Sequence, residues 1–266
     1  MRLIKNIAGK EYHADTCSPT NLEGPVSKSM LWKFSESAFK WRHSKPEKPS
    51  AAMELGSLVH ALCFTPDSVA DEFAVSEFDS FRTKAAQEWR DAQVGKTVIT
   101  QETMNKAQDI ADVVMNDQEL FSLGEKDYEV ALYASIGATQ VKGMVDIAPR
   151  HGNVLADLKT TSSIGSLDAL TRLVVNRGYH WQAALYLDLW NAVTGENRDQ
   201  FRFLFVETDA PHETAWVSFF PRLIDLGREG YMNAIAKFQN CLANDVWPRK
   251  IEGVQEISVP KWLSVE

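Results

Sequence analysis

The chain has 266 residues, of which 44% are hydrophobic, so it is long enough to bury a sizeable core as one large domain. It opens without a charged and apolar leader, and no apolar run reaches the roughly 18 residues that span a bilayer, which predicts a soluble, cytoplasmic protein. Three widely spaced cysteines argue against a disulfide framework or a zinc site.

The net charge of −8 would argue against a nucleic-acid partner if it were evenly distributed. Residues 1–50, however, hold nine Lys/Arg against five Asp/Glu. We expect a short strand or arm over 1–12, a helix capped by Ser27, and a second helix from Ser35 to His43. Cations and aromatic rings alternate here in a pattern able to touch phosphates and stack on bases: Lys28, Trp32, Lys33, Phe39, Lys40, Trp41, Arg42, Lys45 and Lys48. The alternative is two amphipathic helices with solvated lysines.

The segment MELGSLVHALCF, residues 53–64, repeats its apolar residues at helical spacing and predicts a helix. His60 falls on a different face of this helix, beside small residues that leave room for a substrate or a metal. The alternative is a hydrogen-bonded core histidine. Residues 67–95 have a weaker pattern, in which Arg82 is a candidate phosphate contact. Thr100 then caps a helix that extends to Asn116.

The segments YEVALYASI, VKGMVDIA and VLADLKT predict neighbouring strands, the last two joined by a tight connection. Side chains alternate across a strand, so Asp157 and Lys159 share one face while Leu158 packs into a core on the other. A hairpin brings Asp146 across from this pair, and a three-stranded meander adds Glu129 beside Asp146. The alternatives are an Asp–Lys ion pair on a solvated hairpin and a surface glutamate on an edge strand.

Two buried aspartates repel each other, and one lysine neutralises only one of them, so we expect a divalent cation here. Carboxylates together with the backbone carbonyl of Leu158 form a hard oxygen donor set suited to Mg²⁺ or Mn²⁺. A phosphate ester is the expected substrate. The metal would hold phosphate oxygens and acidify a water, while Lys159 orients that water or offsets charge in the transition state.

After Thr161 we expect a polar loop and a short helix, in which Arg172 and Arg177 are further candidate phosphate contacts. The segment GYHWQAALYLDLWNAV predicts a helix that is apolar nearly all round, yet three polar residues share one of its faces: Tyr179, Gln182 and Tyr186. Gln182 is placed to hydrogen-bond an active-site carboxylate or the substrate phosphate, with Tyr186 orienting it; the alternative is a structural role with partners in neighbouring loops. Residues 201–208 and 214–220 continue the sheet, Pro221 begins a long helix, and the tail has no regular period.

In their order and spacing these segments resemble the RecE-type exonucleases, also called exonuclease VIII, of the PD-(D/E)XK nuclease superfamily that includes lambda exonuclease. The resemblance spans nearly the whole chain and rests on these stretches: SKSMLWKFSESA, LGSLVHALCFTP, GKTVIT, YEVALY, VKGMVDIA with VLADLKTT, YHWQAALY, and VWP with ISVPKW. It implies an α/β fold of the α+β type, in which helices flank a mixed central sheet. Within a single domain we expect a mostly helical N-terminal part (1–120), a catalytic sheet core (121–220), and a C-terminal helix and tail (221–266).

The resemblance also implies roles for individual residues. Asp146 and Asp157 match the family's metal-binding aspartates, Lys159 its catalytic lysine, and His60 a histidine at the metal site of RecE-like enzymes. Glu129 matches less well. Gln182 and Tyr186 fit the Q-x-x-x-Y helix of nucleases similar to lambda exonuclease and the RecB nuclease domain. The superfamily's nominal proline is replaced by Val145, a common departure.

The implied activity is a Mg²⁺-dependent exodeoxyribonuclease that degrades one strand of linear duplex DNA from its 5′ end and leaves a 3′ single-stranded tail. Relatives form rings around DNA, so we expect a homo-oligomer, for example a tetramer. The tail would pass to a RecT-like single-strand annealing protein in a phage or prophage recombination pair, in the bacterial cytoplasm. Two other functions stay open, a structure-specific endonuclease and a non-catalytic DNA-end-binding module.

Overall fold

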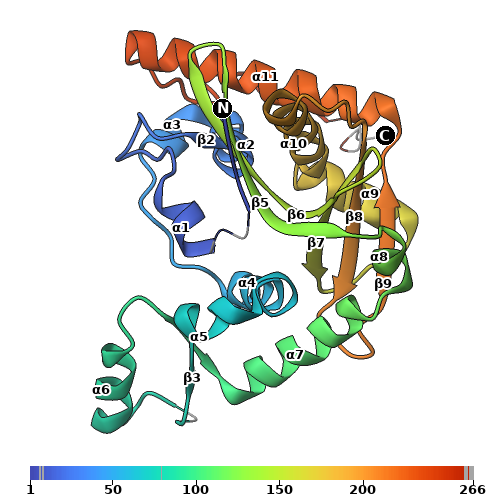
Figure 1. The fold of residues 1–266 in the computed structure, drawn as a ribbon. Coiled ribbons are helices and arrows are strands. Elements are labelled where there is room, and N and C mark those ends of the chain that lie inside the picture. Colours follow the sequence, from blue (N-terminus) through green and yellow to red (C-terminus); the bar gives the residue numbers. More distant parts are fainter. Residues whose placement is uncertain (6, 8, 79, 261–262, 264–266) are drawn as a thin grey trace.

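The computed structural model describes residues 1–5, 7, 9–78, 80–260 and 263 (Figure 1). Its centre is a mixed sheet whose strands lie in the order β1-β5-β6-β7-β8-β9, with the short strand β2 paired to β6. The strands are β1 (Arg2–Ile4), β2 (Val26–Ser27), β5 (Lys126–Ile136), β6 (Thr139–Pro149), β7 (Val154–Thr161), β8 (Gln200–Glu207) and β9 (Thr214–Ser218). Strands β5, β6 and β7 form the antiparallel meander that the sequence predicts, and β8 runs parallel to β7.

Helices cover both faces of this sheet (Figure 1). On one face α4 (Ala51–Phe64) and α7 (Gln101–Met115) pack against Leu158 and Leu204. On the other face α2 (Lys28–Glu36), α9 (Leu167–Asn176), α10 (Tyr179–Thr194) and α11 (Pro221–Asn244) cover Leu155 and Phe203. The alternation along β7 therefore places Leu158 in one core, as predicted from the sequence, and its neighbours Asp157 and Lys159 toward α10.

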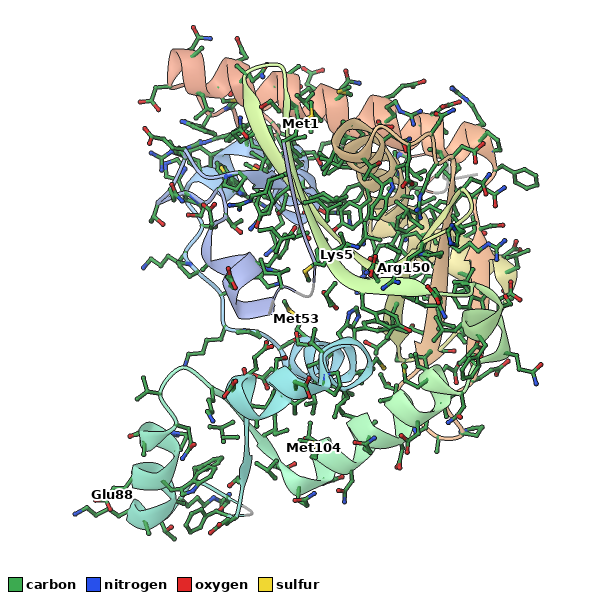
Figure 2. The ribbon with its side chains drawn as sticks, in the orientation of Figure 1. Met1, Lys5, Met53, Glu88, Met104 and Arg150 are labelled. Atoms are coloured by element: carbon green, nitrogen blue, oxygen red, sulfur yellow. The ribbon has the colours of Figure 1, made fainter. Side chains whose placement is uncertain are left out.

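The remaining elements are short. They comprise α1 (Gly9–Ala14), α3 (Ala38–Arg42), the 3-10 turn η1 (Pro66–Ser68), α5 (Val69–Glu72), β3 (Phe73–Ser76), α6 (Lys84–Ala92), β4 (Thr97–Thr100) and α8 (Gln118–Ser122). Strands β3 and β4 form a separate parallel pair, and with α6 they project away from the central sheet; Glu88 marks the end of this projection (Figure 2). The predicted tail forms no helix or strand within residues 245–260, and its last residues lie outside the described part of the chain.

The second helix predicted over Ser35–His43 is present as α3, but it begins later, at Ala38. Ser37 is extended (φ −168°, ψ 109°), and its hydroxyl caps α3 by accepting a hydrogen bond from the Lys40 amide. A serine hydroxyl that caps one helix also ends the preceding one. The caps predicted at Ser27 and Thr100 are confirmed. Among the described helices, none is long and apolar enough to cross a membrane.

The β-ladder is interrupted where β5, β6 and β7 pass one another. Strands β5 and β6 pair at Tyr128–Ile147 and again at Val130–Val145, but Glu129 and Asp146 between them do not pair. Glu129 has a φ of 45°, in the left-handed region that a glutamate rarely adopts. Beyond Ile147–Ala156, β6 and β7 have no further paired residues. The sheet is therefore opened at its middle, at the level of Asp146 and Leu158.

A buried lysine ties the N-terminal segment to the same strand. Lys142 on β6 is completely buried, and its Nζ donates hydrogen bonds to the carbonyls of Tyr12, at 2.5 Å, and Asp15. Its ammonium also lies 4.2 Å from the centre of the Tyr12 ring. Carbonyls at the C-terminal end of a short helix favour a cation, so Lys142 fixes α1 against β6.

Candidate active site

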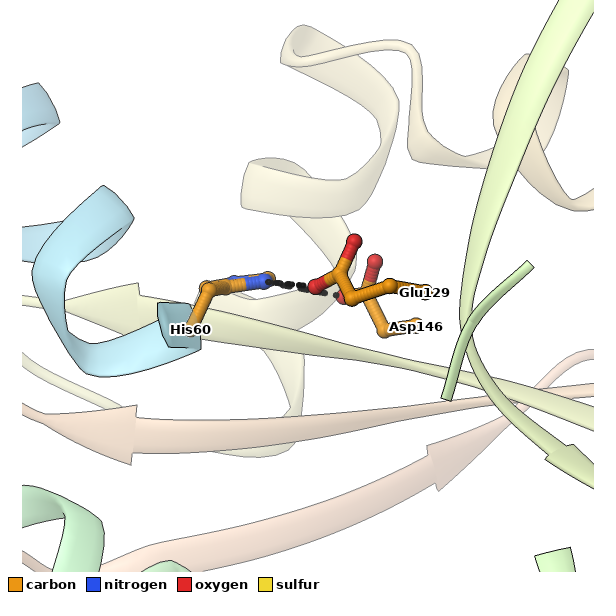
Figure 3. Close-up of side chains that lie close together, drawn as sticks. All are labelled: His60, Glu129 and Asp146. Carbon is orange, nitrogen blue, oxygen red and sulfur yellow. Dashed lines mark ion pairs between the residues drawn. The ribbon is translucent and has the colours of Figure 1, made fainter. Parts of the chain in front are cut away.

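Three side chains from different elements converge at the opening in the sheet. His60 comes from α4, Glu129 from β5 and Asp146 from β6, and their ligand atoms lie within 4.8 Å of one another (Figure 3). His60 Nδ1 is 3.5 Å from Asp146 Oδ2 and 3.6 Å from Glu129 Oε1. Both carboxylates are almost completely buried. Charged groups placed this deeply need a charged partner or a metal ion.

The imidazole of His60 is fixed on its other side. Its Nε2 lies 3.1 Å from the carbonyl oxygen of Leu158 on β7. Because a carbonyl only accepts, Nε2 carries the hydrogen, and Nδ1 faces the two carboxylates. The carbonyl of Leu158 thus orients the imidazole from behind, as groups around metal-binding histidines commonly do. Gly56 permits this approach of α4 to β7, since a β-carbon there would lie 3.2 Å from Thr160 Oγ1.

Asp146 also accepts a backbone hydrogen bond where the ladder between β6 and β7 is interrupted. The Leu158 amide donates to Asp146 Oδ2 at 2.9 Å, so a side-chain carboxylate replaces the missing backbone partner from β6. The backbone groups of Leu158 are both satisfied by site residues, its N–H by Asp146 and its C=O by His60. The site and the strand that supports it are therefore built from the same hydrogen bonds.

Asp157 and Lys159 lie beside this cluster, toward α10. The Lys159 ammonium forms an ion pair with Asp157 Oδ1, and Gln182 Nε2 donates to Asp157 Oδ2. Gln182 thus hydrogen-bonds an active-site carboxylate, one of the two partners proposed for it from the sequence. Lys159 also lies 5.4 Å from the ring centre of Tyr179 and 5.8 Å from that of Phe203. With both oxygens of Asp157 engaged by the protein, the cluster of His60, Glu129 and Asp146 does not include it.

Burial and mutual repulsion shift the pKa values of these groups. Burial, and then the neighbouring charge of Asp146, raise the pKa of Asp157 to about 7. Burial also raises the pKa of Asp146, and the carboxylate of Glu129 adds to this effect. Burial acts to lower the pKa of Lys159, but Asp157 and Asp146 outweigh it and raise the pKa. Lys159 therefore stays a cation at neutral pH.

The residues present fit a divalent metal ion. Glu129 Oε2 is buried and has no hydrogen-bond partner among the described residues, so it is an acceptor that lacks a cation. Two carboxylates and one imidazole nitrogen are a donor set suited to a divalent metal ion. When bound, the ion would supply positive charge at a phosphoryl group and acidify a water. His60, Glu129 and Asp146 are the residues that would hold it.

We expect metal binding to release a proton from His60. Burial acts to lower the pKa of His60, but Asp146 and Glu129 raise it to about 9, so the imidazole is protonated in the metal-free protein. A metal ligand must be neutral, so the affinity for Mn²⁺ should rise by up to roughly tenfold per pH unit between pH 7 and 9. Calorimetry in buffers of different ionisation enthalpy would count the protons. A His60→Ala variant that kept the same pH dependence would contradict this assignment.

Tyr186 is the other residue of the Q-x-x-x-Y pattern. Tyr186 packs against Gly143, where an added β-carbon would lie 2.7 Å from the tyrosine ring, and its ring contacts Phe201. Burial raises the pKa of its hydroxyl far above the usual value. Among the described residues, Tyr186 forms no hydrogen bond with Gln182. The described structure therefore shows no direct contact through which Tyr186 would orient Gln182 in the way that the sequence predicts.

Of the cations predicted to bind DNA, Lys28 lies near the site. Its Nζ donates to the Arg177 carbonyl at 2.5 Å and lies 5.2 Å from the centre of the Tyr179 ring. Tyr179 is therefore flanked by Lys28 and Lys159. Burial and the charge of Lys159 lower the pKa of Lys28 to about 7. Burial of Lys28 corrects the alternative of a solvated lysine at this position.

The other predicted contacts are distributed over the surface. Lys33 is exposed and 3.7 Å from Glu47, Arg172 and Arg177 are exposed at α9, and Arg82 lies on the projection with α6. Lys40 and Arg42 belong to α3. The structure does not bring these six residues together with the carboxylates. Trp41 is buried in the core, and Trp32 packs against Gly178, so these rings are not free to stack on bases.

Tyr12 is a residue near the site that the sequence pattern did not reveal. It is buried, and its pKa is raised first by burial and then by charges that include Glu129 and Asp146. Its place beside β6 depends on Lys142, which binds its carbonyl. A lysine within a strand and a tyrosine 130 positions earlier give no local signal of this contact.

The fold and the site together define a class. A mixed sheet flanked by helices carries a buried Asp146, an Asp157–Leu158–Lys159 triplet and a cluster able to bind a metal ion, which is the arrangement of the PD-(D/E)XK nuclease superfamily. A family model described as "PDDEXK-like domain of unknown function (DUF3799)" matches residues 27–259. The chain belongs to this family.

Two solved structures are similar to this chain. One is a protein from Eubacterium rectale provisionally named an exonuclease, with a TM-score of 0.66 and 15% identity over 95% of this chain and 96% of that chain. The other is a phage-related exonuclease from Haemophilus somnus 129PT, with a TM-score of 0.34 and 14% identity over 69% of this chain and 96% of that one. A comparison with curated proteins finds no significant sequence match. At 15% identity the similarity to the protein from Eubacterium rectale concerns the fold alone.

Proposed function

We propose that the protein is a divalent-metal-dependent nuclease, and specifically a Mg²⁺-dependent 5′-to-3′ exodeoxyribonuclease of the RecE type that acts on linear duplex DNA. The observation that carries the proposal is the convergence of His60, Glu129 and Asp146 beside the Asp157–Lys159 pair. Mn²⁺ would replace Mg²⁺. The strand polarity comes from the sequence resemblance alone.

The charged groups suggest how the site would divide the work. His60, Glu129 and Asp146 would hold the metal ion, which would supply positive charge at the scissile phosphate. Lys159 keeps its proton, so its Nζ donates hydrogen bonds to the attacking water or to a phosphate oxygen and does not act as a base. Gln182 holds Asp157 in place, and Asp157 in turn positions Lys159.

Lys28 and Tyr179 extend the site on the α10 side. The Lys28 and Lys159 amines lie 5.2 and 5.4 Å from the Tyr179 ring centre, and Lys159 is the one of the two that keeps its positive charge at neutral pH. A DNA backbone placed beside Lys159 would meet this charge next to the proposed metal ion. This arrangement supports a phosphate ester as the substrate.

Further features of the proposal come from the resemblance. They are a homo-oligomeric ring such as a tetramer, transfer of the 3′ tail to a RecT-like annealing protein, and a place in the cytoplasm of a bacterial or phage-infected cell. A ring would let an acidic subunit remain on DNA, provided that its basic surfaces line the channel. Sedimentation of the purified protein would test the ring.

Digestion of labelled DNA tests the activity. We expect early loss of a 5′ label from linear duplex in Mg²⁺, retention of a 3′ label at early times, and an intact covalently closed circle, because an exonuclease needs an end. EDTA should stop the reaction. Cutting of the circle would replace this proposal with an endonuclease, and end binding without cleavage in Mg²⁺ or Mn²⁺ would leave only an end-binding module.

A further inference from the structure

A pocket lies outside the catalytic cluster, between α3 and the C-terminal segment 245–253. It has a volume of about 430 Å³ and is lined by Phe39, Trp247, Arg249, Ile251, Glu252 and Gly253. We propose that this pocket binds unpaired DNA, with a base against its aromatic rings and the backbone on its cations. The inference rests on the proposed function, because it takes the DNA strand as ligand.

The walls of the pocket are fixed to each other. The Phe39 amide donates to the Pro248 carbonyl at 3.1 Å, which joins α3 to the C-terminal segment. The Arg249 amide donates to Glu252 Oε1 at 3.2 Å and folds the segment back on itself. Trp247 is anchored against the ring of Trp41, at 5.6 Å between ring centres. The pocket is thus assembled from residues about 200 positions apart in the chain.

Each of two aromatic rings at the pocket lies beside an arginine, and a nucleotide offers a flat base for a ring and a phosphate for a cation. The Arg249 guanidinium lies 4.7 Å from the centre of the Phe39 ring, and that of Arg42 lies 5.5 Å from Trp247. Trp247 already packs on Trp41, and Arg42 donates to the Pro19 carbonyl at 3.0 Å. Phe39 and Arg249 are therefore the pair that a ligand with a flat π face and a negative charge would contact. Bases in a duplex are stacked on their neighbours, so only an unpaired base can enter between these side chains.

The charge around the pocket also complements a polyanion. Arg42 and Arg249 border its aromatic rings, the next residue Lys250 is exposed, and Glu252 is the acidic residue of its lining, whereas the whole chain carries a net charge of −8. The surface at the pocket is therefore more basic than the chain as a whole. An electropositive surface with aromatic side chains is the combination that proteins use to bind single strands without reading their sequence.

The pocket is separate from the candidate active site. Helix α3 belongs to the side of the sheet covered by α2 and α11, whereas His60 approaches from α4 on the opposite side (Figure 1). Aromatic contacts link Trp41 and Trp247 to Phe238 of α11 and not to site residues. Binding in the pocket can thus be measured while the metal site is empty.

Fluorescence anisotropy of a labelled oligo-dT in EDTA tests the proposal. The double substitution Arg249→Ala with Lys250→Ala should weaken binding by about tenfold at low salt and flatten the plot of log affinity against log salt by roughly 1.4, as two lost phosphate contacts require. Phe39→Leu should weaken binding several-fold without changing the slope. The matched control removes two exposed cations elsewhere, Lys84→Ala with Arg222→Ala, and should bind as the wild type does.

Unchanged oligo-dT affinity in Arg249→Ala with Lys250→Ala would overturn the proposal, as would an equal loss of affinity for a blunt hairpin duplex, which has no unpaired base to offer. Nuclease activity is a separate readout. If oligo-dT binding depends on these residues but no DNA is cleaved, the pocket stands and the proposed nuclease fails. If DNA is cleaved but the substitutions leave oligo-dT binding unchanged, the proposed nuclease stands and the pocket proposal fails.

Discussion

Asp146→Asn should abolish nuclease activity without weakening the fold. The substitution removes a carboxylate that faces the proposed metal ion, but an asparagine oxygen can still accept the Leu158 amide. A divalent cation stabilises a phosphoryl transition state by several kcal/mol, so the initial rate on linear duplex should fall by about 10³-fold or more. Thermal melting in EDTA should change little, because the lost attraction between Asp146 and the protonated His60 is offset by the lost repulsion from Glu129 and Asp157.

A matched variant separates the metal site from a general effect of the substitution. Asp188→Asn changes an aspartate that pairs with Arg228 on α11, outside the site. It should retain activity close to that of the wild type, even if its melting temperature falls. The assignment would be refuted by Asp146→Asn protein that melts normally and keeps more than a tenth of the wild-type rate.

Lys159→Met should lose both activity and stability. The substitution leaves Asp157, which is 1% exposed, without its cation. Breaking a buried ion pair on one side costs roughly 3–5 kcal/mol. Because Lys159 holds the pKa of Asp157 down, this pKa should rise above about 7 in the variant. An aspartate whose folded pKa is raised loses stability as pH rises toward that pKa, so the deficit should be larger at pH 8 than at pH 6.

The double substitution Asp157→Asn with Lys159→Met tests the cause of that instability. Both charges are then absent, so denaturant unfolding should return to within about 1–2 kcal/mol of the wild-type free energy, with little dependence on pH. Activity should not return, because Lys159 is still missing. A double variant as unstable as Lys159→Met alone would show that the pair is not what the single substitution disrupts.

Much of the architecture follows from local sequence patterns. The three-stranded meander, the caps at Ser27 and Thr100, and the shared face of Asp157 and Lys159 depend on alternation and turn residues close together in the chain. The contact of Gln182 with Asp157 was also accessible, since a buried amide on an apolar helix needs a partner.

Other features depend on tertiary contacts that no local pattern reports. The left-handed conformation of Glu129 and the unpaired ladder at Asp146 arise where three strands and α4 meet. Alternation alone would have kept the ladder regular. The helix predicted from Ser35 begins only at Ala38, because Ser37 caps it with its hydroxyl. Lys28 is buried, and its Nζ donates to the carbonyl of Arg177, 149 positions later in the chain.

The opening between β6 and β7 has a consequence for dynamics. Since a side chain and not a neighbouring strand holds the Leu158 amide, the strands can change their separation there without breaking any ladder bond. Local fluctuations of low free energy are concentrated where backbone bonding is sparse. The exchange of the Leu158 amide hydrogen with solvent deuterium is therefore a reporter of the site itself, and its rate would register the arrival of a ligand between Asp146 and His60 even when no bond is being cleaved.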